Sequence, residues 1–405
     1  MKRLILTLLF AISYFAVGFS QKSVYIPEDL RSMNLESDTS LWCWQRSAET
    51  RDLIFMWERG FGNDLQAPPR LQGRPMDFNL SVLMERVQSF YTFFRDSLGW
   101  GNGVNSKANR YKMMVMVMYS LDGTAYGGTY DNYIGALWVA PNRIQDKTMN
   151  CMAHELGHSF QSQIMADSIG DCWGGTGFFE MASQWMLWQV NPWWLRDENY
   201  HFEAFKTLTH KAYLAMENIY HSPYVIQWWS DLHGRKSIAE LFRQGRKGED
   251  PVTTYQRLYG LTQQQFCHEM LQGYQHLVNF DFKHAREETR PYACTFDTPL
   301  EEDAKGWLRP KDMPEAYGFN AIRLDERVNL NARSFNVQLR GKDVLYGFVG
   351  VTTDGETLYS PVGATTFKRP KDCQLSHLYL VAMGAPATHG TDGSFPYSFR
   401  VSPKK

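Results

Sequence analysis

The sequence has almost no excess of charge of either sign. Its 405 residues carry 42 basic and 43 acidic side chains, which gives a formal net charge of −1. The overall electrostatics therefore indicate neither nucleic acid nor an anionic membrane surface as a partner. Charged residues make up 21% of the chain and hydrophobic residues 43%, a balance typical of a folded globular protein rather than a disordered one.

Cysteine is also scarce, and its six residues are spread through the chain. They are Cys43, Cys151, Cys172, Cys267, Cys294 and Cys373. No two of them form a Cys-x-x-Cys pair, so a zinc site built from cysteines is not supported. The spacing does not choose between disulfides and small buried thiols. For Cys151 it leaves open both packing beneath its helix and a bridge to Cys172.

Long apolar runs are missing except at the N-terminus. Two basic residues precede an apolar stretch over 4–19, and the small residues Gly18 and Ser20 suit cleavage before Gln21. This pattern predicts a signal peptide over 1–20 and a protein that is secreted, periplasmic or exposed at the cell surface, with no membrane span after cleavage. The alternative is an uncleaved membrane anchor, which the shortness of the apolar run disfavours.

Residues 21–295 mix strand and helix patterns. Apolar runs over 111–120 and 134–140 predict buried strands, and a glycine-rich loop is expected over 126–133 between them. From residue 202 to about 280 the apolar spacing is helical. The expected fold class is α+β, with a mixed sheet followed by a mainly helical second half.

The pattern changes near residue 295. From 305 to 405, short alternating segments such as 334–340 and 377–386 are separated by Gly, Pro, Asp and Thr turns. A turn spacing of about 8–12 residues is that of a β-sandwich. An all-β sandwich domain over 305–405 is therefore expected to follow the 21–295 domain.

Two histidines stand four residues apart in the stretch His-Glu-Leu-Gly-His over 154–158. On an α-helix this spacing separates side chains by only about 40° and 6 Å, so His154 and His158 can offer imidazole nitrogens to one ion. Zinc favours such ligands. Glu155 is rotated by about 100° from His154, which places its carboxylate beside the metal as a general base. The alternative is a surface helix that holds these residues by accident. The expected cap at Asp146 and the strand before the helix argue against an accident.

A catalytic zinc site needs a third protein ligand. The metzincin continuation requires glycine and histidine where this chain has Gln161 and Ile164, and the aspzincin pattern requires aspartate in place of Phe179. Glu180 lies near the start of an apolar helix predicted over 178–190, where a zinc ion would compensate its buried charge. Alternatively, Glu180 is a structural carboxylate favoured at a helix N-terminus. The other candidates for the third ligand are Asp167, Asp171 and Glu203.

The stretch His154-Glu155-Leu156-Gly157-His158 followed by Glu180 resembles the gluzincin arrangement of zinc metallopeptidases. The HExGH variant is similar in particular to the enhancin-like, mucin-active peptidases. The order of elements over about 50–290 also resembles a poorly characterised family of exported bacterial proteins classed as metallopeptidases. The resemblance implies a zincin-like fold for the first domain, Zn2+ held by His154, His158 and Glu180, and Glu155 as the base. The thermolysin-like residues around the glutamate are absent, so the groups that orient the ligands stay open.

The implied activity is hydrolysis of peptide bonds in proteins or glycoproteins, with Glu155 taking the proton of a metal-activated water. A further donor should stabilise the oxyanion. The candidates are His210, Tyr213, Tyr220, His221 and Tyr224. The strand over 134–140, with the loop before it, either pairs with extended substrate or is ordinary structure.

Two features bear on carbohydrate. The tryptophans of the helical region either line a sugar-accepting cleft or pack in the core. They are Trp173, Trp185, Trp188, Trp193, Trp194, Trp228 and Trp229. The C-terminal domain is a candidate for carbohydrate contact. The alternative function is a non-catalytic glycan- or protein-binding surface protein on a zincin scaffold, although the presence of Glu155 argues against it. A weaker alternative is a metal hydrolase that acts on a bond other than a peptide.

Overall fold

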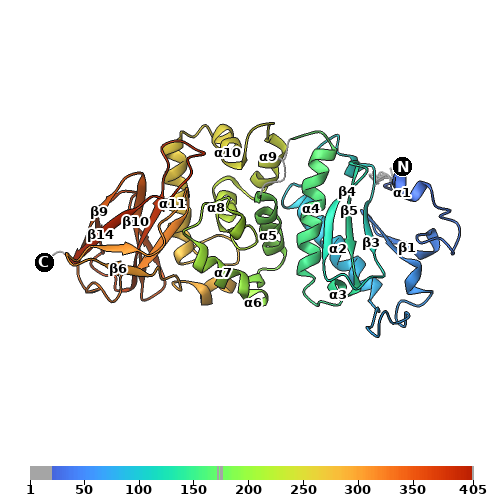
Figure 1. Cartoon of the computed structure of the whole chain (residues 1–405), viewed down its shortest axis with the longest axis horizontal. Coiled ribbons are helices and arrows are strands. Elements are labelled where there is room, and N and C mark those ends of the chain that lie inside the picture. Colours follow the sequence, from blue (N-terminus) through green and yellow to red (C-terminus); the bar gives the residue numbers. More distant parts are fainter. Residues whose placement is uncertain (1–20, 171–172, 174–176, 404–405) are drawn as a thin grey trace, which may run out of the picture.

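The computed structural model describes residues 21–170, 173 and 177–403. The signal peptide expected over 1–20 lies outside these residues. Figure 1 shows a mixed α/β chain with a sheet toward the N-terminus, a block of helices in the middle and further strands at the C-terminal end. Within the described part of the chain, none of the helices combines the length and the hydropathy that crossing a membrane requires.

The strands of the N-terminal sheet run in the order β1-β2-β3-β5-β4. Their bounds are Ser47–Glu49 for β1, Leu53–Trp57 for β2, Met113–Val117 for β3, Ala125–Tyr130 for β4 and Ile134–Val139 for β5. β2, β3 and β5 are parallel, whereas β1 and β4 pair antiparallel with their neighbours. Every residue of β2 and β3 is buried, as expected of central parallel strands that are covered on both faces.

Strand β4 occupies most of the segment 126–133, so the prediction of a loop there is wrong. The strand pairs with β5, and the chain then reverses at Asp131 and Asn132, whose φ angles are +52° and +48°. Two successive positive φ angles are typical of a tight hairpin turn. The glycines serve packing, because a Cβ on Gly127 would lie 1.8 Å from the main-chain oxygen of Glu155. Glycine therefore lets β4 lie directly against the helix that carries the two histidines.

That helix is α4 (Asn150–Ala166), which lies between the N-terminal sheet and α5 (Phe178–Val190) and also contacts α2 (Leu80–Asp96). On the sheet side, the Ser159 hydroxyl donates to the main-chain oxygen of Ala136 in β5 at 2.7 Å. Polar bonds of this kind, together with the close approach of β4, fix the position of α4 relative to the sheet.

The opposite side of α4 packs closely against α5. A Cβ on Gly157 would lie 2.4 Å from the Ser183 hydroxyl oxygen, and that hydroxyl donates to the main-chain oxygen of His154 at 2.6 Å. The glycine of the HELGH stretch is therefore required for the close crossing of two helices.

The start of α4 differs from the sequence-based prediction. A short helix, α3 (Pro141–Ile144), comes first, and Asp146 accepts a hydrogen bond from the Thr148 main-chain N–H at 3.0 Å instead of capping the long helix. α4 then begins after Met149, which adopts a left-handed conformation with φ of +51°. The local turn formed by Asp146 competes with its role as a helix cap.

The middle of the chain is built from further helices. Their bounds are Trp194–Asp197 for α6, Asn199–Leu208 for α7, Tyr224–His233 for α8, Ser237–Gln244 for α9, Pro251–Tyr259 for α10, Gln263–Val278 for α11 and Arg286–Thr289 for α12. Of the tryptophans considered as a sugar-binding surface, only Trp193 is exposed, at 43%. The other six are less than 10% exposed and pack in the core.

The C-terminal strands form two antiparallel sheets, in the orders β11-β10-β13-β8 and β12-β9-β14-β7-β6. The bounds are Leu300–Glu302 for β6, Leu308–Pro310 for β7, Phe319–Arg323 for β8, Ser334–Gly341 for β9, Val344–Thr352 for β10, Thr357–Tyr359 for β11, Thr366–Lys368 for β12, Leu375–Gly384 for β13 and Tyr397–Pro403 for β14. Side chains from both sheets, including Phe335, Phe348 and Phe399, share one apolar cluster.

The other face of the first of these sheets packs on the helices. Its residues Val349, Tyr379 and Val381 belong to the same apolar cluster as the side chains of α11 and of the N-terminal sheet. The Tyr274 hydroxyl of α11 also donates to the main-chain oxygen of Tyr317, just before β8, at 2.7 Å. The main core is therefore continuous across the region near residue 300.

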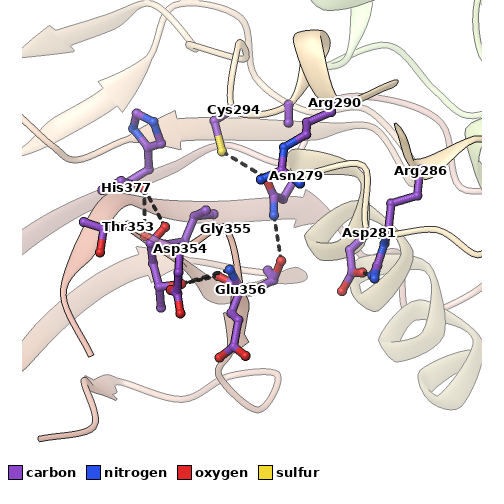
Figure 2. A pocket seen from close by; sticks show the side chains of 15 residues that line it. Asn279, Asp281, Arg286, Arg290, Cys294, Thr353, Asp354, Gly355, Glu356 and His377 are labelled. Carbon is purple, nitrogen blue, oxygen red and sulfur yellow. Dashed lines mark hydrogen bonds and ion pairs between the residues drawn. The ribbon is translucent and has the colours of Figure 1, made fainter. Parts of the chain in front are cut away.

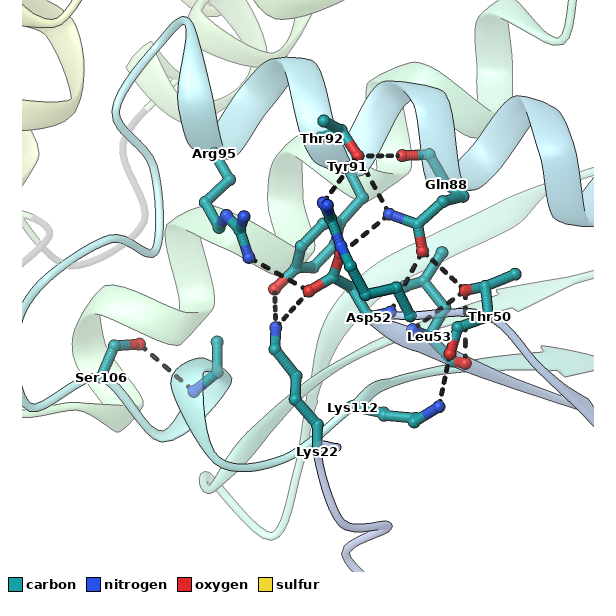
Figure 3. A network of polar contacts seen from close by, with 12 residues as sticks. Lys22, Thr50, Asp52, Leu53, Gln88, Tyr91, Thr92, Arg95, Ser106 and Lys112 are labelled. Atoms are coloured by element: carbon teal, nitrogen blue, oxygen red, sulfur yellow. Dashed lines mark hydrogen bonds and ion pairs between the residues drawn. The ribbon is translucent and has the colours of Figure 1, made fainter. Parts of the chain in front are cut away.

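A buried ionic network ties the N-terminal segment to the first sheet (Figure 3). Asp52 is fully buried and contacts the Lys22 ammonium at 2.5 Å, the Arg51 guanidinium at 2.6 Å and the Arg95 guanidinium at 3.1 Å. The Gln88 amide donates a further hydrogen bond to Asp52 at 2.9 Å. The carboxylate thus joins the segment at Lys22, the beginning of β2 and helix α2.

Candidate metal centre

The structure brings together His154, His158 and Glu180, and their ligand atoms all lie within 4.8 Å of one another. The two histidines project from one face of α4, and Glu180 comes from the first turn of α5. The Nε2 atoms of the histidines are 3.1 Å apart. Glu180 Oε2 lies 3.0 Å from the first and 3.1 Å from the second. Three potential ligand atoms therefore converge on one point.

Two glutamine amides fix the tautomers of the histidines. His154 Nδ1 lies 2.8 Å from Gln184 Oε1, and His158 Nδ1 lies 2.9 Å from Gln161 Oε1. The amide nitrogens donate to main-chain oxygens, that of Gln161 to Phe179 O and that of Gln184 to Tyr220 O. Because a carbonyl can only accept, each amide presents its oxygen to the histidine, whose Nδ1 must carry the proton.

This arrangement fits a metal ion. With the protons on Nδ1, both Nε2 lone pairs face each other and the Glu180 carboxylate, so a cation or a shared proton has to lie between them. Tetrahedral zinc with bonds of about 2.0–2.1 Å places its ligand atoms roughly 3.3 Å apart, close to the observed separations. Two imidazoles and one carboxylate are also a donor set that leaves a fourth position open.

The charges of the site favour a cation as well. Burial raises the pKa of the Glu180 carboxyl, but the adjacent His154 and His158 imidazoles outweigh burial and hold that pKa far below its ordinary range. Burial lowers the pKa of His158, yet the neighbouring Glu180 and Glu155 carboxylates raise it above its ordinary value. His158 therefore sits in a negative local potential, beside a Glu180 carboxylate that stays ionised.

Glu155 points toward the sheet edge. Its Oε2 atom accepts a hydrogen bond of 2.8 Å from the Gly127 main-chain N–H of β4. The same β4 contact that requires glycine at position 127 thus holds the carboxylate of the residue next to His154. One oxygen of Glu155 is oriented by main-chain structure.

Of the oxyanion candidates, Tyr220 lies at the metal cluster. Its ring centre is 6.2 Å from that of His154, and burial together with the adjacent Glu180 carboxylate raises the pKa of its hydroxyl. His221 contacts His201 instead, with 2.8 Å between their Nδ1 atoms. Tyr213 and Tyr224 are buried in the core. The main-chain oxygen of His210 accepts from the Glu315 N–H near the C-terminal sheets.

The other third-ligand candidates are engaged elsewhere. Asp167 accepts hydrogen bonds from the Ser106 hydroxyl at 2.5 Å and the Lys107 N–H at 2.9 Å, which ties the end of α4 to a neighbouring loop. Glu203 is exposed on α7 and pairs with Lys206 at 2.9 Å. Asp171 lies outside the described residues, as does Cys172, the other half of the bridge considered for Cys151.

Sequence reasoning missed the two glutamines that orient the histidines. Their spacing carries a signal, because Gln161 follows His158 by one helical turn and Gln184 follows Glu180 by one turn. Each amide therefore lies on the same helix face as a ligand.

A separate cavity of about 600 Å³ lies where the helices meet the C-terminal sheets (Figure 2). Its lining includes Asn279, Asp281, Arg290 and the turn between β10 and β11. Asp281 forms an ion pair with Arg286 there and accepts a hydrogen bond from the Tyr359 hydroxyl at 2.7 Å. None of the residues of the metal cluster contributes to this cavity.

Comparisons with known proteins give one match over nearly the whole chain. The model of a family of unknown function, DUF6055, matches residues 16–402. No curated protein matches the chain.

The solved structures that resemble this chain at low identity include three metallopeptidases. The ZmpB metallopeptidase from Clostridium perfringens is 11% identical, with a TM-score of 0.33 over 88% of this chain and 70% of that chain. A metallopeptidase in complex with Tn antigen is 12% identical, with a TM-score of 0.32 over 89% and 75%. The catalytic module of the metalloprotease ZmpA from Clostridium perfringens is 9% identical, with a TM-score of 0.30 over 89% and 68%. On the extent of the family match, the chain belongs to DUF6055.

Proposed function

We propose that this protein is an exported zinc-dependent peptidase of the gluzincin type, with a zincin-like catalytic domain over 21–295. The observation that carries the proposal is the convergence of His154, His158 and Glu180, with both histidines held in the Nε2-ligating tautomer. Glu155, oriented by β4 beside this cluster, is the general base.

Zn2+ in this site would lower the pKa of a bound water toward 7 and polarise the scissile carbonyl. The roles of the protein groups follow from their positions. Glu155 takes the proton of the attacking water and passes it to the leaving amine. The Tyr220 hydroxyl, next to Glu180, is the donor best placed to stabilise the oxyanion. Gln161 and Gln184 keep the two imidazoles oriented throughout.

Strand β4 is the proposed binding edge for substrate. β4 is an edge strand of the N-terminal sheet, and one of its sides pairs with β5. Among the described residues no strand pairs with its other side, so an extended peptide can add there by main-chain hydrogen bonds. The peptide would then lie beside the metal cluster, because β4 contacts α4 at Gly127.

The proposed substrates are proteins or glycoproteins. Apart from β6, the strands of the two C-terminal sheets, which share an apolar cluster, would form the accessory β-sandwich over 305–405. Carbohydrate contact by this part would use the polar cavity of Figure 2 rather than Trp307, since the Arg340 and Arg400 guanidinium groups cover that ring, 3.7 Å and 4.5 Å from its centre.

One experiment tests the activity. The purified protein is analysed for zinc by elemental analysis, and wild type is compared with Glu155→Gln on a mixed protein and glycoprotein digest. Glutamine keeps an oxygen for the Gly127 N–H but cannot act as a base, so we expect equal zinc content and loss of cleavage. A wild type without stoichiometric metal contradicts the zinc site. Zinc in both proteins with cleavage by neither favours the glycan- or protein-binding alternative.

A further inference from the structure

A line of hydrogen bonds leads from the metal cluster to two further histidines. Gln184 Nε2 lies 3.3 Å from His201 Nε2, in addition to its bond to the main-chain oxygen of Tyr220. His201 Nδ1 lies 2.8 Å from His221 Nδ1. The line therefore runs from His154 through Gln184 and His201 to His221.

Along the line from Gln184 to His221, each group donates its hydrogen bond to the next one, away from the metal cluster. The Gln184 amide nitrogen is fixed by the main-chain oxygen of Tyr220, so it also donates toward His201, whose Nε2 must accept. The proton of neutral His201 is then on Nδ1, where it donates to His221 Nδ1. His221 in turn carries its proton on Nε2.

The surroundings of His201 keep it neutral. Burial, with the neighbouring His221 and His154 imidazoles, lowers the pKa of His201 to about 4. The carboxylate of Glu198 lies 3.8 Å from His201 Nε2, beyond hydrogen-bond distance, and instead accepts a bond from the Trp194 indole at 2.8 Å. The rings of Tyr200 and Trp194 pack against the imidazole at 4.2 Å and 5.6 Å between centres.

We propose that His201 is a positioning residue of the metal site, which acts through Gln184 and is backed by His221. If the Gln184 amide turned over, its NH2 group would face His154 Nδ1. The proton of His154 would then move to Nε2, the atom that would bind the metal. The Gln184 NH2 group donates one hydrogen to the main-chain oxygen of Tyr220 and the other to His201 Nε2. Turning the amide over would therefore break two donated hydrogen bonds, whereas without His201 it would break one.

The first test reads the tautomers directly. Nitrogen shifts of 15N-histidine-labelled protein at pH 8 are expected to show His201 protonated on Nδ1 and His221 protonated on Nε2. A proton on His201 Nε2 would overturn the proposal. This result is independent of the proposed peptidase activity, because it is measured whether or not zinc is bound and whether or not any substrate is cleaved.

The second test compares two variants by chelator competition for zinc. His201→Gln can place an amide oxygen near the position of Nε2 and should bind zinc like wild type. His201→Phe keeps the packed ring but has no acceptor, and we expect about 10-fold weaker zinc binding. Equal losses in both variants would show a packing role alone, and unchanged affinity in His201→Phe would also reject the proposal. If His201→Phe does not fold, the tautomers of the wild type decide.

Discussion

Glu180 is the carboxylate shared by both histidines, and the metal site depends on it most directly. We predict that Glu180→Ala lowers zinc affinity by at least about 100-fold, because loss of a ligand should exceed the 10–100-fold typical of an outer partner. Chelator competition measures the change. Glu203→Ala, which alters an exposed glutamate paired with Lys206, is the control and should bind zinc normally. Near-normal affinity in Glu180→Ala would move the third ligand elsewhere.

At this scale the sequence already contained the His154, His158 and Glu155 pattern, since helical geometry alone relates residues three and four apart. The approach of Glu180 depends on how α5 crosses α4, which the sequence suggested only through a charged residue in an apolar helix. Spacing places Gln184 on the helix face of Glu180, but the contacts of Gln184 and His201 could not be predicted from it. They depend on main-chain oxygens, such as that of Tyr220, which any residue provides.

The contact between β4 and α4 is the element on which the orientation of Glu155 depends. A Cβ on Gly127 would lie 1.8 Å from the Glu155 main-chain oxygen, whereas a Cβ on Gly128 would meet nothing closer than Trp138 at 3.7 Å. We predict that Gly127→Ala lowers the free energy of unfolding by at least about 2 kcal/mol and reduces cleavage, because β4 has to move away. Gly128→Ala is the matched control. Urea unfolding and digest assays measure both, and equal effects would argue against this contact.

The glycine-rich segment shows why some elements could be predicted from the sequence and others could not. Composition alone read 126–133 as a loop, since glycine weakens strands. In the structure this segment is mostly the edge strand β4. Its glycine at position 127 is needed because α4 approaches too closely for any side chain there. Buried strands such as β3 were predictable because their apolar residues are continuous. The predicted Asp146 cap failed because that side chain closes its own local turn.

For the whole molecule, Asp52 links acid stability to the N-terminal segment. Burial raises the pKa of Asp52, but hydrogen bonds from Lys22 and Arg51 outweigh burial and keep it below its ordinary value. A lowered folded-state pKa stabilises the fold above the unfolded value of about 3.9, and this contribution is lost as the pH falls through the folded-state pKa. We therefore predict that unfolding becomes easier below about pH 4, partly because Asp52 takes up a proton.

The variant Asp52→Asn tests how much of the acid stability is due to this carboxylate. The dependence of stability on pH in the acid range should become weaker, and stability near neutral pH should fall by about 3 kcal/mol, because the largely covered Lys22 ammonium loses its carboxylate partner. Thermal unfolding as a function of pH measures both effects. Asp392→Asn, which alters an exposed residue, should change neither. An unchanged acid limb in Asp52→Asn would assign that stability to other carboxylates.

The boundary near residue 295 separates two patterns of sequence but not two cores. Val349, Tyr379 and Val381 of the C-terminal strands pack in the cluster that contains α11. We predict that a chain of residues 21–295 alone unfolds without cooperativity or aggregates, because this apolar face of α11 is then open to water. Calorimetry and size-exclusion chromatography measure this. A soluble 21–295 chain with one sharp transition would show that the helical block needs no cover.

The hydrogen bond that orients Glu155 comes from the peptide N–H of Gly127, a group that is not encoded by any side chain. Neighbouring β4 positions are therefore free to diversify without losing it. Tyr126, half exposed beside Gly127, is one such position. A library that randomises Tyr126 while keeping Gly127 would alter substrate preference and leave the base in place. The same separation offers natural selection a route to new specificities within this fold.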